Sequence, residues 1–142
     1  MKTNLQIPAN KKADTKLLYP DLSFAVVGLC YGVHNEIGKF GREKQYADLL
    51  EQKLKESGMR YKREYRIGDT NNVVDFLIED KIILELKAKR FVPTGDYDQA
   101  QRYLQATGVK LGILVNFGGM YVRSHRVLKV DYSSRKPVPT HL

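Results

Sequence analysis

The sequence has no tryptophan and a single cysteine among its 142 residues. One cysteine, Cys30, excludes an internal disulfide bond, which fits a reducing cytosol. The first twenty residues are polar and basic, without the apolar run that is typical of a secretory signal peptide. The longest mostly apolar stretch, residues 22–33, is too short to cross a bilayer. We therefore expect a cytoplasmic protein without a membrane partner.

Internal repeats and low-complexity segments are also missing, so nothing in the chain indicates a second domain. Residues 1–18 are expected to form a loosely ordered basic arm and residues 131–142 a flexible tail. This leaves residues 19–130 as one domain, long enough to bury a core without metal or disulfide bonds. The formal net charge of +8 favours a polyanionic partner, nucleic acid first.

Apolar residues at helical spacing predict a first helix that begins after Pro20 and ends at Gly38. Asp21 and Ser23 are its candidate N-caps. His34 lies beside the apolar stripe of this helix. There a hydrogen-bonded structural histidine is favoured over a metal ligand.

A second helix is predicted over residues 42–57 and a third over residues 97–107, each followed by a glycine. Glu43 lies one turn before the apolar stripe of the second helix. It is either a first-turn glutamate favoured by the helix dipole or an acid that points toward the sheet. Gln99 and Tyr103 share one face of the third helix, which fits ordinary amphipathic packing as well as a site. The residues alone leave both alternatives open.

Alternating or continuously apolar segments predict strands at residues 60–67, 73–78, 82–88, 110–117 and 121–128. In the first of these strands, Tyr61, Tyr65 and Ile67 are expected to share the buried face. The second and third strands form a hairpin whose charges are unusual for a core element. Because side chains alternate along a strand, Asp75 points away from the apolar face of the hairpin.

The register of the hairpin decides which charges meet. A two-residue turn would mix apolar and acidic residues on one face, whereas a three-residue turn at residues 79–81 keeps Val74, Phe76 and Ile78 on an intact apolar face. The second register pairs Ile78 with Ile82, Phe76 with Leu84, Asp75 with Glu85 and Val73 with Lys87.

Asp75 and Glu85 then have Cβ atoms roughly 5 Å apart. Two carboxylates at that separation repel by roughly 3 kcal/mol at an effective dielectric of about 20. Either Lys87 or a divalent cation is needed between them. Oxygen ligands from carboxylates favour magnesium, before calcium or manganese, over zinc.

These residues carry a resemblance to known nucleases. Asp75 followed by residues 85–87, Glu-Leu-Lys, resembles the D…(D/E)-x-K signature of the PD-(D/E)XK nuclease fold. Gly41, Glu43 and Tyr46 are similar to the naming motif of the GxxExxY family, a group of small single-domain proteins within that superfamily. The resemblance implies an α/β fold of the restriction-endonuclease type, with a central mixed β-sheet flanked by helices.

Two further segments extend the resemblance over residues 19–129. Gln99 and Tyr103, about a dozen residues after the Glu-Leu-Lys run, resemble the Gln-x-x-x-Tyr motif of the RecB-like branch. Residues 106–118 again resemble the GxxExxY family. Together, the four motifs in family order imply that Glu43 and Gln99 are site residues.

The resemblance implies a magnesium-dependent or manganese-dependent nuclease that hydrolyses phosphodiester bonds, with DNA as the expected substrate. Tyr103 would buttress its helix or stack on a base. The small chain offers limited surface for a duplex, which favours, without requiring, a homodimer. The implied site residues are catalytic Asp75, Glu85, Lys87 and Gln99; metal-binding Glu43, Asp75, Glu85 and the carbonyl of Leu86; and substrate-binding Tyr103, Lys89, Arg90 and Arg42.

Two other functions are weighed against this one. A binding module for nucleic acid or a protein partner would keep the fold without catalysis, but it would have no physical reason to keep two opposed carboxylates. Glycoside hydrolysis also uses paired carboxylates, but it needs carbohydrate-binding aromatic residues, and this chain lacks tryptophan.

Overall fold

A computed structural model describes residues 17–132, so the predicted arm and tail lie almost entirely outside the described residues. Its elements follow in the order α2 (Pro20–Ile37), α3 (Glu43–Ser57), β1 (Tyr61–Arg66), β2 (Val73–Ile78), β3 (Ile82–Lys87), α4 (Thr94–Thr107), β4 (Leu111–Asn116) and β5 (Arg123–Leu128). All three predicted helices and all five predicted strands are confirmed. None of the described helices combines the length and hydropathy that a bilayer-spanning helix needs.

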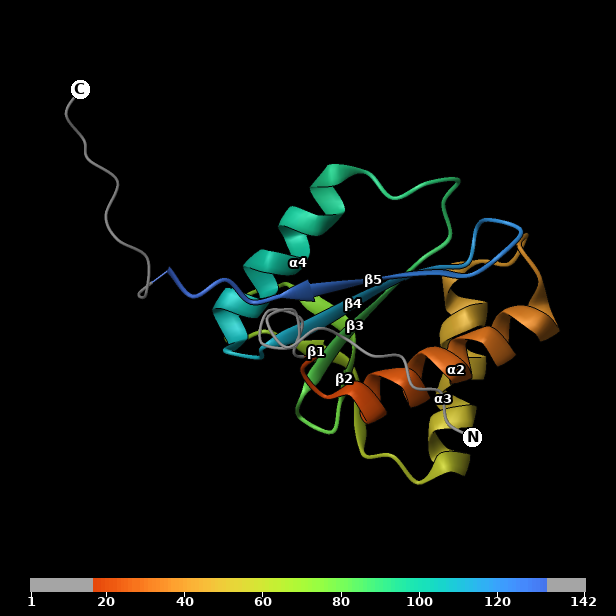
Figure 1. Ribbon diagram of the computed structural model, residues 1–142, viewed down its shortest axis with the longest axis horizontal. Coiled ribbons are helices and arrows are strands. Elements are labelled where there is room, and N and C mark those ends of the chain that lie inside the picture. Colours follow the sequence, from red (N-terminus) through yellow and green to blue (C-terminus); the bar gives the residue numbers. More distant parts are fainter. Residues whose placement is uncertain (1–16, 133–142) are drawn as a thin grey trace, which may run out of the picture.

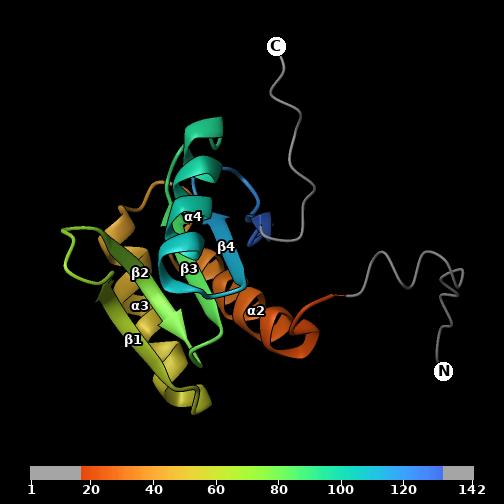
Figure 2. The ribbon, with the colours of Figure 1, turned by 90° about the vertical axis from the view of Figure 1, so that its left-hand side faces the viewer.

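The five strands form one sheet in the order β1-β2-β3-β4-β5. Neighbouring strands are antiparallel except β3 and β4, which are parallel because α4 carries the chain back between them. Helices α2 and α3 cover one face of the sheet and α4 covers the other (Figures 1 and 2). The predicted mixed sheet flanked by helices is confirmed.

Two apolar clusters hold these layers together. The larger lies between the α2–α3 pair and the sheet, and it includes Cys30, Leu50 and Phe76. The smaller lies under α4 and includes Leu77 and Leu104. The parallel pair at the centre of the sheet is covered on both faces, which explains why β4 is continuously apolar in sequence.

The C-terminal ends of the helices were predicted more accurately than their N-terminal starts. Gly58 and Gly108 end α3 and α4 in the left-handed region, where a residue without Cβ is favoured. The predicted N-caps of α2 are wrong, because the helix begins at Pro20 and the Ser23 hydroxyl donates to the Tyr19 carbonyl (2.9 Å) from inside the first turn. Helix α4 begins at Thr94, three residues before the predicted start.

Strands β1 and β2 change face part-way along. Tyr61 packs in the larger cluster, whereas Tyr65 and Val74 pack in the smaller one. Glu64 has a φ of 51°, and the ladder between the strands skips the pair of Glu64 with Asp75. The expected shared face of Tyr61, Tyr65 and Ile67 is therefore wrong, as is the expectation that Val74 shares a face with Phe76 and Ile78.

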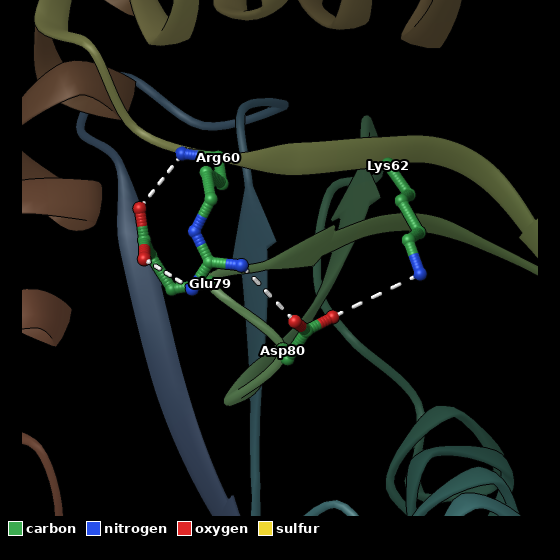
Figure 3. Close-up of polar contacts among 4 residues, drawn as sticks. All are labelled: Arg60, Lys62, Glu79 and Asp80. Atoms are coloured by element: carbon green, nitrogen blue, oxygen red, sulfur yellow. Dashed lines mark hydrogen bonds and ion pairs between the residues drawn. The ribbon is translucent and has the colours of Figure 1, made fainter.

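The hairpin turn has the predicted three residues between the paired Ile78 and Ile82. Glu79 and Asp80 both have positive φ, near 53° and 56°. Arg60 holds this turn: its guanidinium contacts the carboxylates of both acids, and its backbone N–H donates to Glu79 (2.7 Å; Figure 3). These charges are satisfied among themselves, at the opposite end of the hairpin from Asp75.

Candidate active site

Asp75 and Glu85 meet where strands β2 and β3 separate. The ladder between these strands ends at the pair of Phe76 with Leu84. Beyond it, the Asp75 N–H donates to Glu85 Oε2 (2.9 Å) and the Leu86 N–H donates to Asp75 Oδ2 (2.7 Å). Each carboxylate thus accepts a hydrogen bond from the backbone of the opposite strand.

This geometry corrects the predicted register beyond Phe76. Direct pairing of Asp75 with Glu85, and of Val73 with Lys87, is absent from the ladder of the described strands. The reason is that the two carboxylates replace the backbone carbonyls as acceptors, so the strands part at this point. The prediction that Asp75 and Glu85 lie together is confirmed by their shared hydrogen bonds.

The surroundings of this pair disfavour two negative charges. Burial raises the pKa of Glu85 to about 8, and the charge of Asp75 adds to the rise. Burial also raises the pKa of Asp75, while its hydrogen bond from Leu86 opposes the rise. Neither carboxylate forms an ion pair with another described residue. The protein alone therefore supplies too little positive charge to hold both groups ionised at neutral pH.

The spare oxygens of the pair fit a hard cation. Among residues 17–132, Asp75 Oδ1 and Glu85 Oε1 accept no hydrogen bond, and no buried side-chain oxygen lacks a partner, so these atoms keep some access to solvent. Carboxylate oxygens are the ligands that magnesium and manganese prefer. The donor chemistry at this point therefore fits the expected ion.

Glu43 lies near the pair without joining it. A pocket of about 260 Å³ is lined by Glu43, Lys44, Ala47, Arg63, Glu64, Asp75 and Leu86. The charge of Glu43 contributes to the raised pKa values of Asp75 and Glu85. The described residues nevertheless contain no group of three or more His, Cys, Asp or Glu side chains placed to hold a metal ion. Glu43 faces the same space as Asp75 but stands apart from it.

The basic residues that line this pocket are already engaged. Lys44 contacts Asp48 at 2.8 Å. Arg63 contacts Asp48 and Glu51 at 2.8 and 2.9 Å. The charge of Lys87 lowers the pKa of both carboxylates, and the charge of Arg63 also lowers that of Asp75.

Lys87 ends strand β3, and its side chain is 14% exposed. Its Nζ lies 3.8 Å from Asp96 Oδ1, while Lys89 Nζ lies 2.8 Å from Asp96 Oδ2. Asp96 is in the first turn of α4, where an acid is also favoured by the helix dipole. Sequence analysis missed this contact. An acid seven residues after one lysine and nine after another is too common a spacing to reveal it.

A second missed residue, Asn116, fixes the loop between β3 and α4. Asn116 Oδ1 accepts the Lys89 N–H (2.9 Å), and Asn116 Nδ2 donates to the Lys89 carbonyl (2.8 Å). Gly118 permits this close approach, because a Cβ there would lie 2.2 Å from the Lys89 oxygen. The two hydrogen bonds between Asn116 and Lys89 fix the direction in which the chain continues after Lys87.

Tyr103 lies near the carboxylates on the α4 side, since the charges of Glu85 and Asp75 both raise its pKa. Tyr103 packs in the smaller cluster and is 8% exposed, which leaves its ring little room to stack on a base. Burial raises the pKa of Tyr103, and the negative charge of Glu85 adds to the rise, whereas a side-chain hydrogen bond with Gln99 lowers it. Gln99 lies beside Tyr103 on the same helix.

The remaining predicted substrate-binding residues lie on two separate segments of the chain. Arg42 is the exposed N-cap residue of α3, beside Glu43. Lys89 and Arg90 lie in the loop between β3 and α4. His34 is buried and hydrogen-bonded to the Gly119 carbonyl (3.0 Å), as expected of a structural histidine.

Tyr46 shows why a glycine and a tyrosine accompany Glu43. Its hydroxyl donates to the Gly38 carbonyl (2.6 Å) and accepts the Gly41 N–H (3.0 Å), so the α2–α3 loop is wrapped over it. A Cβ at Gly41 would lie 2.9 Å from the Tyr46 ring. The motif thus presents Glu43 at the start of α3.

We expect Tyr46→Phe to lower the free energy of unfolding by about 1–2 kcal/mol, because the two loop groups lose their partner. The ring would keep its stacking on Phe117 at 4.3 Å. Urea unfolding of this variant and of Tyr31→Phe, a half-exposed tyrosine of α2, gives the comparison. Equal stability of both variants would show that the hydroxyl does not hold the loop.

The comparisons with known proteins agree with this arrangement. A family model described as the PD-(D/E)XK nuclease superfamily matches residues 20–128, from α2 to the end of β5. The chain belongs to this superfamily. Members of the PD-(D/E)XK superfamily are in general nucleases, hydrolases that typically use divalent metal ions.

A solved structure titled "Crystal structure of SSO0001" is similar to this PD-(D/E)XK chain at 18% identity, with a TM-score of 0.48. The similarity covers 89% of this chain, and this chain spans 63% of the length of that one. No match is found among curated proteins.

Proposed function

We propose that this protein hydrolyses phosphodiester bonds in nucleic acid, with DNA as the expected substrate and magnesium or manganese as the cofactor. The observation that carries the proposal is the pair of half-buried Asp75 and buried Glu85, each with one oxygen that accepts a backbone hydrogen bond and one that accepts none among the described residues. A cation bound by both carboxylates, with a phosphate beside Lys87, would balance the negative charges of this pair. Membership in a nuclease superfamily supports the same conclusion.

The roles follow from the positions of the side chains. Asp75, Glu85 and the Leu86 carbonyl would hold the cation, and Glu43 would add its negative charge from the same pocket. When bound, a divalent cation neutralises the carboxylates and polarises the scissile phosphate. The Lys87 ammonium would orient the attacking water and stabilise the negative charge that develops on the phosphate. Gln99 would act as a positioning residue through Tyr103.

We also assign the chain to the GxxExxY family and the RecB-like branch within the superfamily. The support is that the matching residues have separate physical tasks here. Gly41 and Tyr46 shape the loop that presents Glu43, while Tyr103 lies near Glu85 on the α4 side with Gln99 beside it. A cytoplasmic location and a homodimer are further parts of this proposal.

The test is cleavage of labelled single-stranded and double-stranded DNA and RNA by the purified protein. We expect cutting with magnesium or manganese, none with EDTA, and none from Asp75→Asn. Asp69→Asn, an exposed acid in the loop before β2, is the matched control and should cut normally. Binding without cutting, under every metal and in all variants, would instead support a catalytically silent binding module.

A further inference from the structure

A second concave surface lies beside the candidate active site. It encloses about 250 Å³, and its lining includes Arg90, Phe91, Tyr97, Asn116, Arg123 and His125. These residues come from the β3–α4 loop, the first turns of α4 and the facing ends of β4 and β5. We call this surface the α4–β5 pocket.

The sheet register places the α4–β5 pocket next to Lys87. Lys87 pairs with Asn116 across β3 and β4, and Asn116 pairs with Arg123 across β4 and β5. At about 4.8 Å between strands, this puts the backbones of Lys87 and Arg123 roughly 10 Å apart. On the helix side, Tyr97 directly follows Asp96, the acid that contacts Lys87. A nucleic-acid strand with one phosphate at Lys87 would therefore have a neighbouring nucleotide at the pocket.

Flat aromatic surfaces form part of the pocket wall. The rings of Tyr97 and His125 pack edge to face, with centroids 5.5 Å apart. Phe91, at the same pocket, is 71% exposed. Aromatic side chains of this kind stack on nucleobases with little regard to sequence, because every base has a π-face.

The α4–β5 pocket contains two arginines without an acidic partner among the described residues. Within the described part of the chain, neither Arg90 nor Arg123 forms an ion pair or a side-chain hydrogen bond. By contrast, Arg60 and Arg63 are paired with acids, and Arg126 bonds to Ser23. A free guanidinium beside an aromatic wall is suited to the phosphate that accompanies a stacked base.

We infer that the α4–β5 pocket binds an unpaired nucleobase, so that the substrate of the neighbouring site is a single strand. This inference rests on the proposed function for the location of the cut. In a duplex the faces of the bases are covered by their neighbours, and only an unstacked base can enter a pocket and lie on Phe91 or Tyr97. The pocket therefore distinguishes a single strand from a duplex and does not distinguish between base sequences.

The test measures binding in EDTA, where no cutting occurs, by fluorescence anisotropy of three probes. These are a single-stranded oligodeoxynucleotide, a blunt duplex of the same sequence, and an abasic single strand with the same number of phosphates. We expect the normal single strand to bind more tightly than the other two. Phe91→Ala and Tyr97→Leu should each weaken it roughly tenfold while leaving the abasic strand unchanged.

Phe24→Ala is the matched control, since Phe24 is 83% exposed on α2, away from both pockets. Equal weakening of normal and abasic strands, or tighter binding of the duplex, would overturn the inference. The two proposals can fail separately. Base-dependent binding without cleavage under any metal would support the base-binding pocket and contradict the nuclease activity. Cleavage with base-independent binding would support the nuclease activity and contradict the base-binding pocket.

Discussion

Replacing Lys87 with methionine is expected to lower phosphodiester cleavage at least about a hundredfold, in the range known for loss of one preorganised electrostatic group. Lys87 is largely shielded from solvent, and its charge acts on both Asp75 and Glu85. Methionine keeps most of the volume of the side chain and removes the charge. Single-turnover cleavage with saturating magnesium isolates the chemical step from binding.

The control for this variant is Lys55→Met, which makes the same charge change at an exposed position in the last turn of α3. We expect its cleavage rate to match that of the wild type. A similar loss in both variants would show that net charge, rather than the position of Lys87, governs the rate. Retention of the rate by Lys87→Met within a few-fold would remove Lys87 from the chemistry.

The sequence predicted the parts of the site that depend on local pattern. Asp75, Glu85 and Lys87 follow from the alternation of β2 and β3 and from the intact apolar pairs near the hairpin turn. The spacing of four residues predicts that Gln99 and Tyr103 share a helix face, whereas their assignment to the site came from the resemblance. In each case the residues are close in the chain or share a regular element, so the period of the element fixes their relation.

The residues that sequence analysis missed come together only through tertiary structure. Asp96 reaches Lys87 because α4 crosses back over the sheet, and Asn116 reaches Lys89 because β4 pairs in parallel with β3. Their sequence separations carry no period. The separation of β2 from β3 beyond Phe76 could not be predicted from the sequence either, because it depends on side-chain oxygens that replace backbone carbonyls as hydrogen-bond acceptors.

The change of face at Glu64 and Asp75 has the same origin. A left-handed φ at a glutamate has no sequence signature, unlike a glycine at a helix end. The consequence for the site is direct. Val74 packs in the cluster under α4 together with Tyr103, whereas Asp75 lines a pocket with Glu43 and Ala47 of α3.

The second large effect is expected in stability against pH. The pKa of Glu85 is raised from 4.5 to about 8 in the folded protein, first by burial and then by the charge of Asp75. Between these two values the folded state binds more protons than the unfolded state. Unfolding then becomes easier as the pH rises, and this contribution is lost once the pH passes the folded pKa. The metal-free protein should therefore be less stable at about pH 9 than at about pH 5.

Glu85→Gln removes this penalty, because the amide stays neutral and its oxygen can still accept the Asp75 N–H. In EDTA at about pH 9, we expect the variant to exceed the wild type in free energy of unfolding by on the order of 3 kcal/mol. At about pH 5 the two proteins should be nearly equal. Urea unfolding at both pH values measures the difference.

Two further arms of the experiment identify the source of the penalty. Glu56→Gln, an exposed glutamate of α3, should follow the wild-type dependence on pH. Magnesium should stabilise the wild type at about pH 9 and have little effect on Glu85→Gln, because a cation that neutralises the pair binds only the folded state. If Glu85→Gln instead kept the wild-type slope, the buried carboxyl would not be the destabilising group. The reason for placing a cation between Asp75 and Glu85 would then disappear.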